Sequence, residues 1–277
     1  MNFRTGLWPV LFCLLVNTGA VAESGVPSLP AISIIIDDMG KRLPSGQRVT
    51  ALPGPVACAF LPQAKHTRVL AEQAWQAGKE VMLHLPMDSV DRRALDAGAV
   101  TLDMTESQFR KTVYENLAAV PHVSGVNNHM GSLLTRHPGH MLWLMRILQQ
   151  YGGNPLFFVD SRTTVATVAR RLAMESGVPS IDRKVFLDNE VESGAITYQL
   201  QRLLHLARRE GAAVAIGHPY PQTLSLLEQF IPQLQDRGIR LVAVSELIEI
   251  EQHKGEPTWQ ASWSPSHKAA KNSKPSL

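Results

Sequence analysis

The sequence predicts an α/β protein built as a single distorted (β/α) barrel of seven or eight βα units. From residue 31 to about residue 250, short apolar runs rich in β-branched residues alternate with longer segments of helical periodicity. This alternation is typical of repeated βα units around a parallel sheet. The length of 277 residues fits two average domains or one barrel, and the absence of a Ser-, Pro- or Gly-rich linker favours one barrel.

The composition indicates a globular chain with a substantial core. Hydrophobic residues make up 44% of the sequence and charged residues 18%, with a mean hydropathy of −0.05. These values exclude a disordered or fibrous protein. The net charge is +3, and much of the excess lies near the C-terminus, so the body of the chain is near neutral. We therefore expect no nucleic-acid partner.

The first 22 residues read as a signal peptide. Arg4 precedes an apolar run over residues 7–16, and residues 20–22 read Ala-Val-Ala, which predicts cleavage near Ala22. The run has about half of the ~20 residues that cross a bilayer, so no mature membrane anchor is expected. The sequence thus predicts a periplasmic or secreted bacterial protein.

The rest of the chain divides into three parts. Residues 23–30 form a short lead, and residues 31–252 form the predicted barrel domain. Residues 253–277 lack periodicity and are rich in Lys, Ser and Pro, which predicts a disordered tail. Cys13 leaves with the signal peptide, so Cys58 has no partner for an internal disulfide and is expected to be a buried, small apolar side chain.

The predicted elements follow from apolar runs and boundary signals. A capping box over residues 105–108 predicts one helix start, and Pro221 suits the first turn of another. The expected helices are residues 67–76, 107–119, 141–151, 165–176, 197–210 and 224–237. The expected strands are residues 32–36, 56–60, 81–85, 123–126, 156–159, 184–187, 214–216 and 239–242.

Polar side chains directly follow five of the predicted strands. Taken singly, each has an ordinary structural explanation, such as a helix cap, an ion pair, a turn or a hydrogen-bonded core histidine. Parallel strands, however, gather their carboxyl ends on one rim, where α/β enzymes carry their sites. The occurrence of such residues at five strand exits of one sheet therefore favours a functional site. The residues are Asp37, Asp38, His84, Asn127, Asn128, His129, Asp160, Arg162 and His218.

These residue types predict a chemistry. One carboxylate and two neutral imidazoles suit Zn²⁺ or a similar divalent ion, with positions left open for water and substrate. Such an ion polarises a carbonyl and lowers the pKa of water toward ~7. A second carboxylate then accepts the water proton, and a protonated histidine delivers one to the leaving group. The set is suited to hydrolysing an amide or an ester.

Five segments carry motifs in a fixed order along the chain. They read Ile-Ile-Ile-Asp-Asp-Met-Gly (34–40), Leu-His-Leu-Pro-Met (83–87), Gly-Val-Asn-Asn-His-Met-Gly-Ser (125–132), Phe-Phe-Val-Asp-Ser-Arg-Thr-Thr (157–164) and Ile-Gly-His-Pro-Tyr-Pro (216–221). In these segments the chain resembles the divergent polysaccharide deacetylase family. The resemblance implies a distorted barrel of the glycoside hydrolase/deacetylase type and metal-dependent removal of N-acetyl groups from amino-sugar polymers.

The resemblance also implies roles for individual residues. Asp37 would be the general base and Asp38 a metal ligand, and His84 takes the place of the first metal-binding histidine. His218 is similar to the late histidine that acts as general acid. Asp160 resembles a carboxylate that supports the acid–base residues.

The chain departs from ordinary deacetylases at the second histidine ligand. Those enzymes place it four residues after the first, where this chain has Asp88. We predict that His129 substitutes, so that Asp38, His84 and His129 hold a divalent metal, with Zn²⁺ the expected ion.

The resemblance says less about substrate binding. Ordinary deacetylases have an Arg-x-Pro-Tyr type segment that helps to hold the substrate, and this segment is not recognisable here. The amides of Asn127 and Asn128 and the guanidinium of Arg162 are the polar candidates. Tyr220, beside His218, is the candidate for stacking on a sugar ring.

The sequence thus predicts an exported metal-dependent hydrolase that acts on an acylated cell-envelope glycan, with peptidoglycan the most accessible polymer. An alternative stays open. The missing histidine also fits a catalytically silent barrel that binds glycan or an envelope partner as a scaffold or regulator. The oligomeric state is not predicted.

Overall fold

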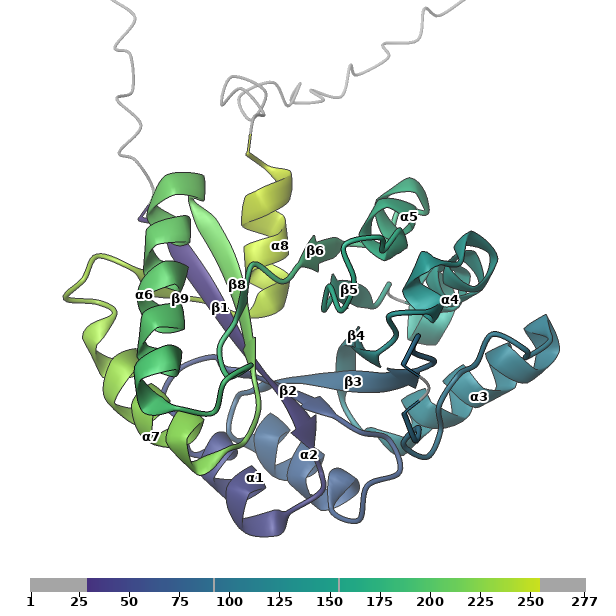
Figure 1. Ribbon diagram of the computed structural model, residues 1–277, viewed down its shortest axis with the longest axis horizontal. Coiled ribbons are helices and arrows are strands. Elements are labelled where there is room, and N and C mark those ends of the chain that lie inside the picture. The colour runs from purple at the N-terminus through teal and green to yellow at the C-terminus, as the bar shows by residue number, and fades with distance from the viewer. Residues whose placement is uncertain (1–28, 92, 154, 255–277) are drawn as a thin grey trace, which may run out of the picture.

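The computed structural model describes residues 29–254, apart from residues 92 and 154 (Figure 1). The predicted signal peptide lies outside the described residues, as does nearly all of the predicted tail. Within the described part a nine-stranded sheet has the main order β6-β5-β4-β3-β2-β1-β8-β7, and every pairing is parallel. The strands are β1 (Ala31–Met39), β2 (Ala57–Phe60), β3 (Glu80–Met87), β4 (Val123–Met130), β5 (Phe157–Asp160), β6 (Ser180–Asp182), β7 (Val185–Phe186), β8 (Ala212–Gly217) and β9 (Arg240–Leu241).

The sheet curls until its two ends meet. Strands β6 and β7 are the two ends of the main order, yet only Arg183 and Lys184 separate them in the chain. The Arg183 N–H donates to the Asp160 carbonyl at 2.9 Å, and the Lys184 N–H donates to the Val214 carbonyl at 2.9 Å. The link therefore joins β5 on one side to β8 on the other, and the predicted distorted barrel is confirmed.

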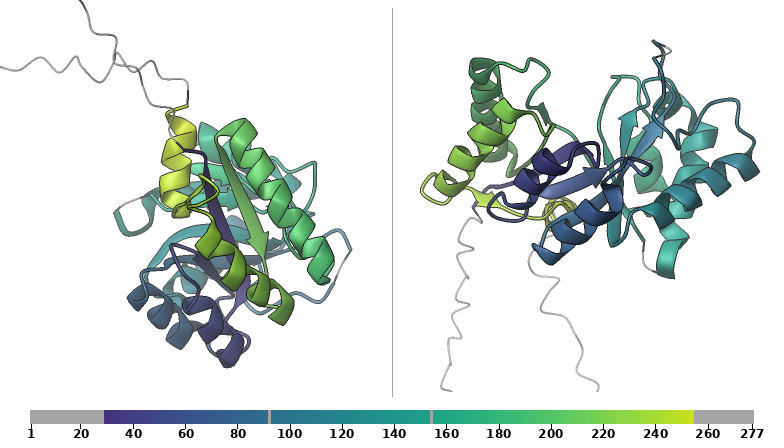
Figure 2. Two further views of the ribbon diagram at one scale, coloured as in Figure 1. Left: turned by 90° about the vertical axis from the view of Figure 1, so that its left-hand side faces the viewer. Right: turned by 90° about the horizontal axis from the view of Figure 1, so that it is seen from below.

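Helices surround the curled sheet, as Figure 2 shows from two further sides. The larger apolar cluster lies between the sheet and these helices, and a second one fills the inside of the barrel, where α8 also contributes. Among the described helices, none is long and apolar enough to span a membrane. The helices are α1 (Leu43–Thr50), α2 (Thr67–Gln76), α3 (Glu106–Ala119), α4 (Pro138–Gln150), α5 (Ala169–Glu175), α6 (Ser193–Glu210), α7 (Pro221–Phe230) and α8 (Val244–Gln252).

Several boundary predictions are confirmed. Thr105 and Gln108 form the predicted reciprocal capping box at the start of α3. Pro221 is the first residue of α7, where its fixed φ and missing N–H cost nothing. Cys58 is fully buried, and burial raises the pKa of its thiol to about 12. This cysteine is therefore a core side chain.

Several element predictions need correction, among them the helix expected over residues 224–237, which is α7 (Pro221–Phe230). Strand β6 and helix α1 were not predicted, because β6 has only three residues and α1 contains Pro44 and Gly46. The helix expected over residues 165–176 begins only at Ala169, since hydroxyl groups of the preceding threonines accept backbone N–H groups in turns. The strand expected over residues 239–242 is reduced to β9, which pairs with β1 outside the main order.

Candidate active site

The alternation of side chains along β1, β3 and β4 sends one set of side chains from each strand into the barrel. On β1, Ile35 joins the interior cluster while Ile34 and Ile36 face the helices. Asp37 therefore follows Ile35 on the interior face. Met82 on β3 is also interior, so His84 points inward in the same way. In the β3–β4 register His84 pairs with Asn127 and Pro86 with His129, so these strand ends deliver their polar residues to one place.

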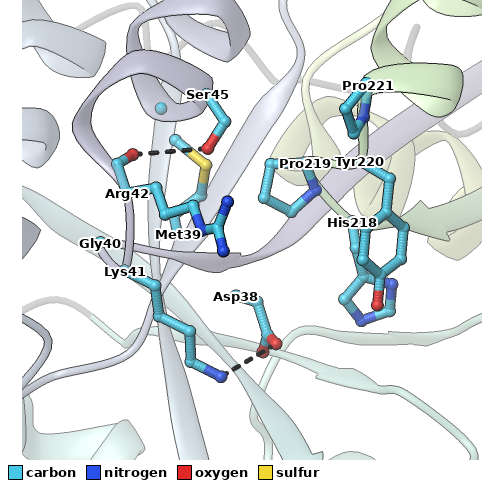
Figure 3. Close-up of a pocket in the computed structure, with 11 residues that line it drawn as sticks. Asp38, Met39, Gly40, Lys41, Arg42, Ser45, His218, Pro219, Tyr220 and Pro221 are labelled. Atoms are coloured by element: carbon cyan, nitrogen blue, oxygen red, sulfur yellow. Dashed lines mark hydrogen bonds and ion pairs between the residues drawn. The ribbon is translucent and has the colours of Figure 1, made fainter.

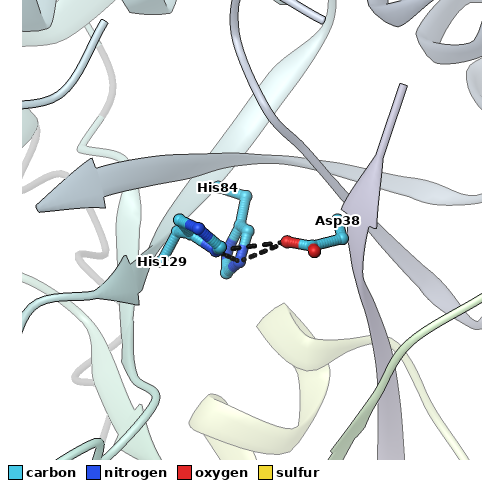
Figure 4. A group of neighbouring side chains, drawn as sticks. All are labelled: Asp38, His84 and His129. Carbon is cyan, nitrogen blue, oxygen red and sulfur yellow. Dashed lines mark hydrogen bonds and ion pairs between the residues drawn. The ribbon is translucent and has the colours of Figure 1, made fainter. Parts of the chain in front are cut away.

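Three donor atoms converge at this place (Figure 4). Asp38 Oδ1 lies 3.5 Å from His84 Nε2 and 3.1 Å from His129 Nδ1, and the two nitrogens lie 3.0 Å apart. A tetrahedral ion with bonds of about 2.0–2.2 Å needs ligand atoms about 3.3–3.6 Å apart. The triangle is close to that size, so the residues fit a divalent metal.

The outer nitrogen of each imidazole has its own acceptor. His84 Nδ1 lies 2.8 Å from Asn127 Oδ1, which accepts its proton. His129 Nε2 lies 3.0 Å from Asp96 Oδ2. Both contacts place the ring proton on the outer nitrogen and leave the inner lone pair facing Asp38, which is how outer partners orient metal-binding histidines.

Asp38 has two features that ordinary packing does not explain. Its Oδ1 is buried and forms no hydrogen bond within the described residues. Its backbone has a φ of 55°, an uncommon conformation that a non-glycine residue adopts at a cost and that is frequent at functional sites. A buried carboxylate oxygen facing two imidazole nitrogens without a bonded hydrogen suits a cation as its third neighbour.

The charges around Asp38 and His84 are strongly coupled. Burial alone would raise the pKa of Asp38, but the neighbouring His129 and His84 outweigh it and hold that pKa far below the ordinary value. Burial opposes a charged His84, yet the carboxylates of Asp37 and Asp38 raise its pKa. Lys41 Nζ lies 3.2 Å from Asp38 Oδ2, so it pairs with the oxygen that does not face the imidazoles.

Asp37 is a separate, more deeply buried carboxylate. Asn127 Nδ2 donates to its Oδ1 at 2.8 Å, and its Oδ2 lies 3.6 Å from His84 Nε2. Burial raises the pKa of Asp37 above its ordinary value, although the charges of His84 and His218 act in the opposite direction. A carboxylate made more basic in this way is suited to accept a proton.

His218, at the exit of β8, has Asp188 as its carboxylate partner, and the predicted supporting carboxylate, Asp160, does not contact it. Asp188 Oδ1 lies 2.9 Å from His218 Nδ1, while Asp188 Oδ2 accepts the His218 N–H at 2.6 Å and the Thr223 hydroxyl at 2.8 Å. Burial disfavours the imidazolium, but the hydrogen bond to Asp188 and the charges of the nearby carboxylates together outweigh burial and raise the pKa of His218. The raised pKa favours the protonated ring, the form that a general acid needs.

A pocket of about 320 Å³ opens between the β1–α1 and β8–α7 connections (Figure 3). Its lining includes Asp38 and His218, so it reaches both the metal-type triangle and the acid–base histidine. Tyr220 is 40% exposed, lines the same pocket and has its ring centre 5.6 Å from that of His218. Its place is compatible with the predicted contact to a sugar ring.

The structure places the other predicted residues away from this pocket or behind it. Asp160 accepts the Arg162 N–H and the Thr167 hydroxyl, both at 2.8 Å, so its carboxylate organises its own loop and Asp188 supports His218 instead. The Arg162 guanidinium pairs with Asp182 at 3.2 Å.

Asn127 and Asn128 are buried, with exposures of 0% and 1%. Asn127 uses its amide on His84, Asp37 and Ser161. Asn128 donates to the Met130 carbonyl and accepts the Ser161 N–H. Neither amide has a free, exposed atom for a substrate, so the structure corrects their predicted role from substrate binding to positioning.

Three residues of the site were not predicted from the sequence. Asp96 lies in a segment without periodicity and offered no signal, whereas Asp188 directly follows the expected strand over residues 184–187 and could have been found by the strand-exit pattern. Lys41 follows the Asp-Asp pair by three residues, and its Nζ lies 3.2 Å from Asp38 Oδ2 and 3.6 Å from Asp96 Oδ2. For Lys41, only this short spacing offered a signal.

Comparison with known proteins identifies the family. The family model described as divergent polysaccharide deacetylase matches residues 34–248. The chain belongs to this family. The matched range contains the five motif segments together with Asp96 and Asp188.

The relatives by sequence are themselves without an assigned activity. The uncharacterised Escherichia coli protein YibQ is 37% identical over 217 residues, which cover 78% of this chain and 67% of that protein. An uncharacterised Haemophilus influenzae protein is 36% identical over 216 residues, covering 78% of this chain and 76% of its own length. Membership in the family is therefore shown, and the reaction is not assigned by these relatives.

Solved structures show the same fold at low identity. The uncharacterised Agrobacterium tumefaciens protein ATU2773 superposes with a TM-score of 0.75 at 21% identity, covering 81% of this chain and 91% of that one. The Bacillus subtilis peptidoglycan deacetylase PdaC superposes with a TM-score of 0.53 at 13% identity, covering 86% of this chain and 100% of that one. The curled parallel sheet is thus shared with a deacetylase.

Proposed function

We propose that this protein is an exported, divalent-metal-dependent hydrolase that removes acyl groups from a cell-envelope glycan. The observation that carries the proposal is the triangle of Asp38 Oδ1, His84 Nε2 and His129 Nδ1, with sides of 3.0–3.5 Å and both imidazoles oriented by outer acceptors. The proposed ligand set is thus one carboxylate and two histidines, with Zn²⁺ the expected ion.

The acid–base residues flank these ligands. A bound ion would supply Lewis acidity toward the acyl carbonyl and the attacking water. Asp37 accepts the water proton, because burial raises its pKa and its Oδ2 has no hydrogen bond from Asn127. His218, whose pKa is raised by the hydrogen bond and charge of Asp188, delivers a proton to the departing amine or alcohol.

The substrate class and location rest on other supports. Family membership supports an acylated polysaccharide, and the deacetylase with the shared fold is by its name a peptidoglycan deacetylase. Residues 1–22 read as a signal peptide, which supports action outside the cytoplasm. Peptidoglycan is accordingly the first polymer to test.

An acetate-release assay tests the proposal. The purified mature protein, loaded with Zn²⁺, is incubated with N-acetylated amino-sugar oligomers and with peptidoglycan fragments. We expect acetate release that stops with a chelator and returns when the metal is restored. A protein that binds these glycans and contains the metal, yet releases no acetate from any of them, would instead support the scaffold alternative.

A further inference from the structure

The pocket beside the metal-type triangle has an excess of positive charge. Among its lining residues, Lys41 and Arg42 are permanent cations, whereas Asp38 is the one carboxylate. A cation held by Asp38 and the two histidines would cancel that carboxylate as well. The interior of the pocket therefore favours an anionic group on whatever enters it.

The two cations are used differently. Lys41 already pairs with Asp38 and Asp96, at 3.2 and 3.6 Å. The guanidinium of Arg42 has no ion pair or hydrogen bond within the described residues, and Figure 3 shows it directed into the pocket, toward the side where Asp38 and Pro219 lie. Arg42 is thus available for a ligand.

Another arginine on the same helix shows the contrast. Arg48 in α1 forms a two-bond pair with Glu228, at 2.6 and 2.9 Å, and also donates to Ser225 at 2.8 Å. That guanidinium is occupied by the fold. Arg42, six residues earlier at the N-cap of α1, presents the same planar fork to the pocket, and such a fork matches a carboxylate with two parallel hydrogen bonds.

The remaining walls suit a sugar. The pocket is closed on the other side by Pro219, Tyr220 and Pro221, which present flat apolar surface opposite the charged side. Its volume of about 320 Å³ lies at the small end of the usual range for ligand sites, about 300–1,000 Å³. One face therefore contacts a ring while the other receives a charge.

We propose that this pocket selects an acylated sugar bearing a carboxylate, with Arg42 as the residue that recognises the carboxylate. The inference rests on the proposed function, since it places the acidic group beside the reacting acyl group. It distinguishes an acidic envelope glycan from a neutral polymer of acetylated glucosamine, which the proposed function alone does not do.

A set of matched probes tests the inference. The first is an oligosaccharide of alternating N-acetylglucosamine and N-acetylmuramic acid without peptides, and the second is the same oligosaccharide with each carboxylate converted to the neutral carboxamide. A phosphorylated N-acetylglucosamine oligomer supplies the other source of anion. Both kcat/KM for acetate release and Kd by calorimetry are measured with the metal-loaded protein.

The expected result is at least a tenfold preference for the carboxylate over the carboxamide, in Kd or in kcat/KM. Arg42→Gln should reduce that preference by about tenfold, because it removes a charge-assisted pair. Arg146→Gln, a matched loss of charge on the exposed side of α4, should keep the preference.

The inference is overturned if the wild type does not distinguish carboxylate from carboxamide, or if Arg42→Gln keeps the full preference. A stronger response to the phosphate would overturn the carboxylate assignment. Acetate release without a preference would leave the proposed function standing. Preferential binding of the carboxylate without any release would support this inference and count against the proposed function.

Discussion

Two corners of the barrel rim carry carboxylates at strand ends, yet they differ in what those carboxylates contact. At the β1–β3–β4 corner, Asp38 Oδ1 faces two imidazoles and forms no hydrogen bond within the described residues. At the β5–β6 corner, Asp182 pairs with Arg162, Arg170 and Lys184. At the first corner a carboxylate oxygen therefore remains available to bind a ligand. At the second corner the carboxylate oxygens already pair with cations of the fold.

The difference teaches that a polar residue at a strand exit is only a candidate. Asp160 and Arg162 satisfy the same sequence pattern as Asp37 and His84, but a loop hydroxyl, a backbone N–H and Asp182 occupy their polar atoms. A functional site is recognised by groups whose hydrogen-bonding capacity remains unused and directed at a common point.

The largest effect is expected at Asp37. Asp37→Asn keeps the shape and an acceptor for Asn127, but it removes the basicity that accepts a proton. Loss of a general base lowers the rate by about 10²- to 10⁴-fold. We expect a fall of that size in kcat, with metal content unchanged. Equal kcat values for the variant and the wild type would show that Asp37 is not the base.

The next effect concerns the outer partner of His129. Asp96→Ala removes the acceptor for His129 Nε2, so the ring loses its fixed tautomer and orientation. Removing such a partner lowers metal affinity by about 10- to 100-fold, which a competition titration measures. Asp103→Ala removes an exposed carboxylate bonded to Thr101 and is the matched control. Equal affinities for the two variants would contradict the orienting role.

A pH shift is expected from Asp188→Asn. The hydrogen bond and charge of Asp188 raise the pKa of His218, and the general acid must be protonated. The variant lowers that pKa, so the decline of kcat on the basic side should move to lower pH. An unmoved basic limb would remove His218 from the role of acid.

The same pKa shift has a consequence for stability. A histidine whose pKa is raised in the folded state stabilises the fold fully below its unfolded pKa of about 6.5. That contribution is lost as pH rises through the folded-state pKa. Asp188→Asn should therefore lower the melting temperature more at pH 5.5 than at pH 9, and the opposite order would contradict the assignment.

The smallest effect on the site is expected from the second corner. Asp182→Asn breaks ion pairs made by a carboxylate that is 6% exposed, because it removes the negative charge and one of the two acceptor oxygens that face the cations. We expect a loss of about 1–3 kcal/mol in the free energy of unfolding, measured by urea titration, with metal content unchanged. A loss of metal from Asp182→Asn would contradict the conclusion that the β5–β6 corner has no part in metal binding.

Much of the fold was predictable because it depends on local periodicity. The short apolar runs predicted β1, β3 and β8, and the capping box at Thr105 predicted the start of α3. Strand β6 escaped prediction because three residues carry no period. Its position depends on pairing with β5 and on the link through Arg183, and neither is visible in a single sequence.

The site was partly predictable for a related reason. The positions of Asp38, His84 and His129 at strand ends made them candidates, and the structure places the three side chains together. Asp96, the partner of His129, was harder to find because it reaches the site from an irregular segment, whereas Asp188, the partner of His218, follows the expected strand over residues 184–187 and was open to the same pattern. The burial of Asn127 was also hidden, since an amide in a polar motif looks the same whether it faces a substrate or a neighbouring carboxylate.

The central claim is that the first corner holds one divalent ion through Asp38, His84 and His129. Elemental analysis of the purified mature protein, dialysed after loading with Zn²⁺, tests it most directly, alongside His129→Ala and the matched surface variant His205→Ala. The account predicts about one ion per chain in the wild type and in His205→Ala, and none in His129→Ala. Full occupancy in folded His129→Ala would contradict it.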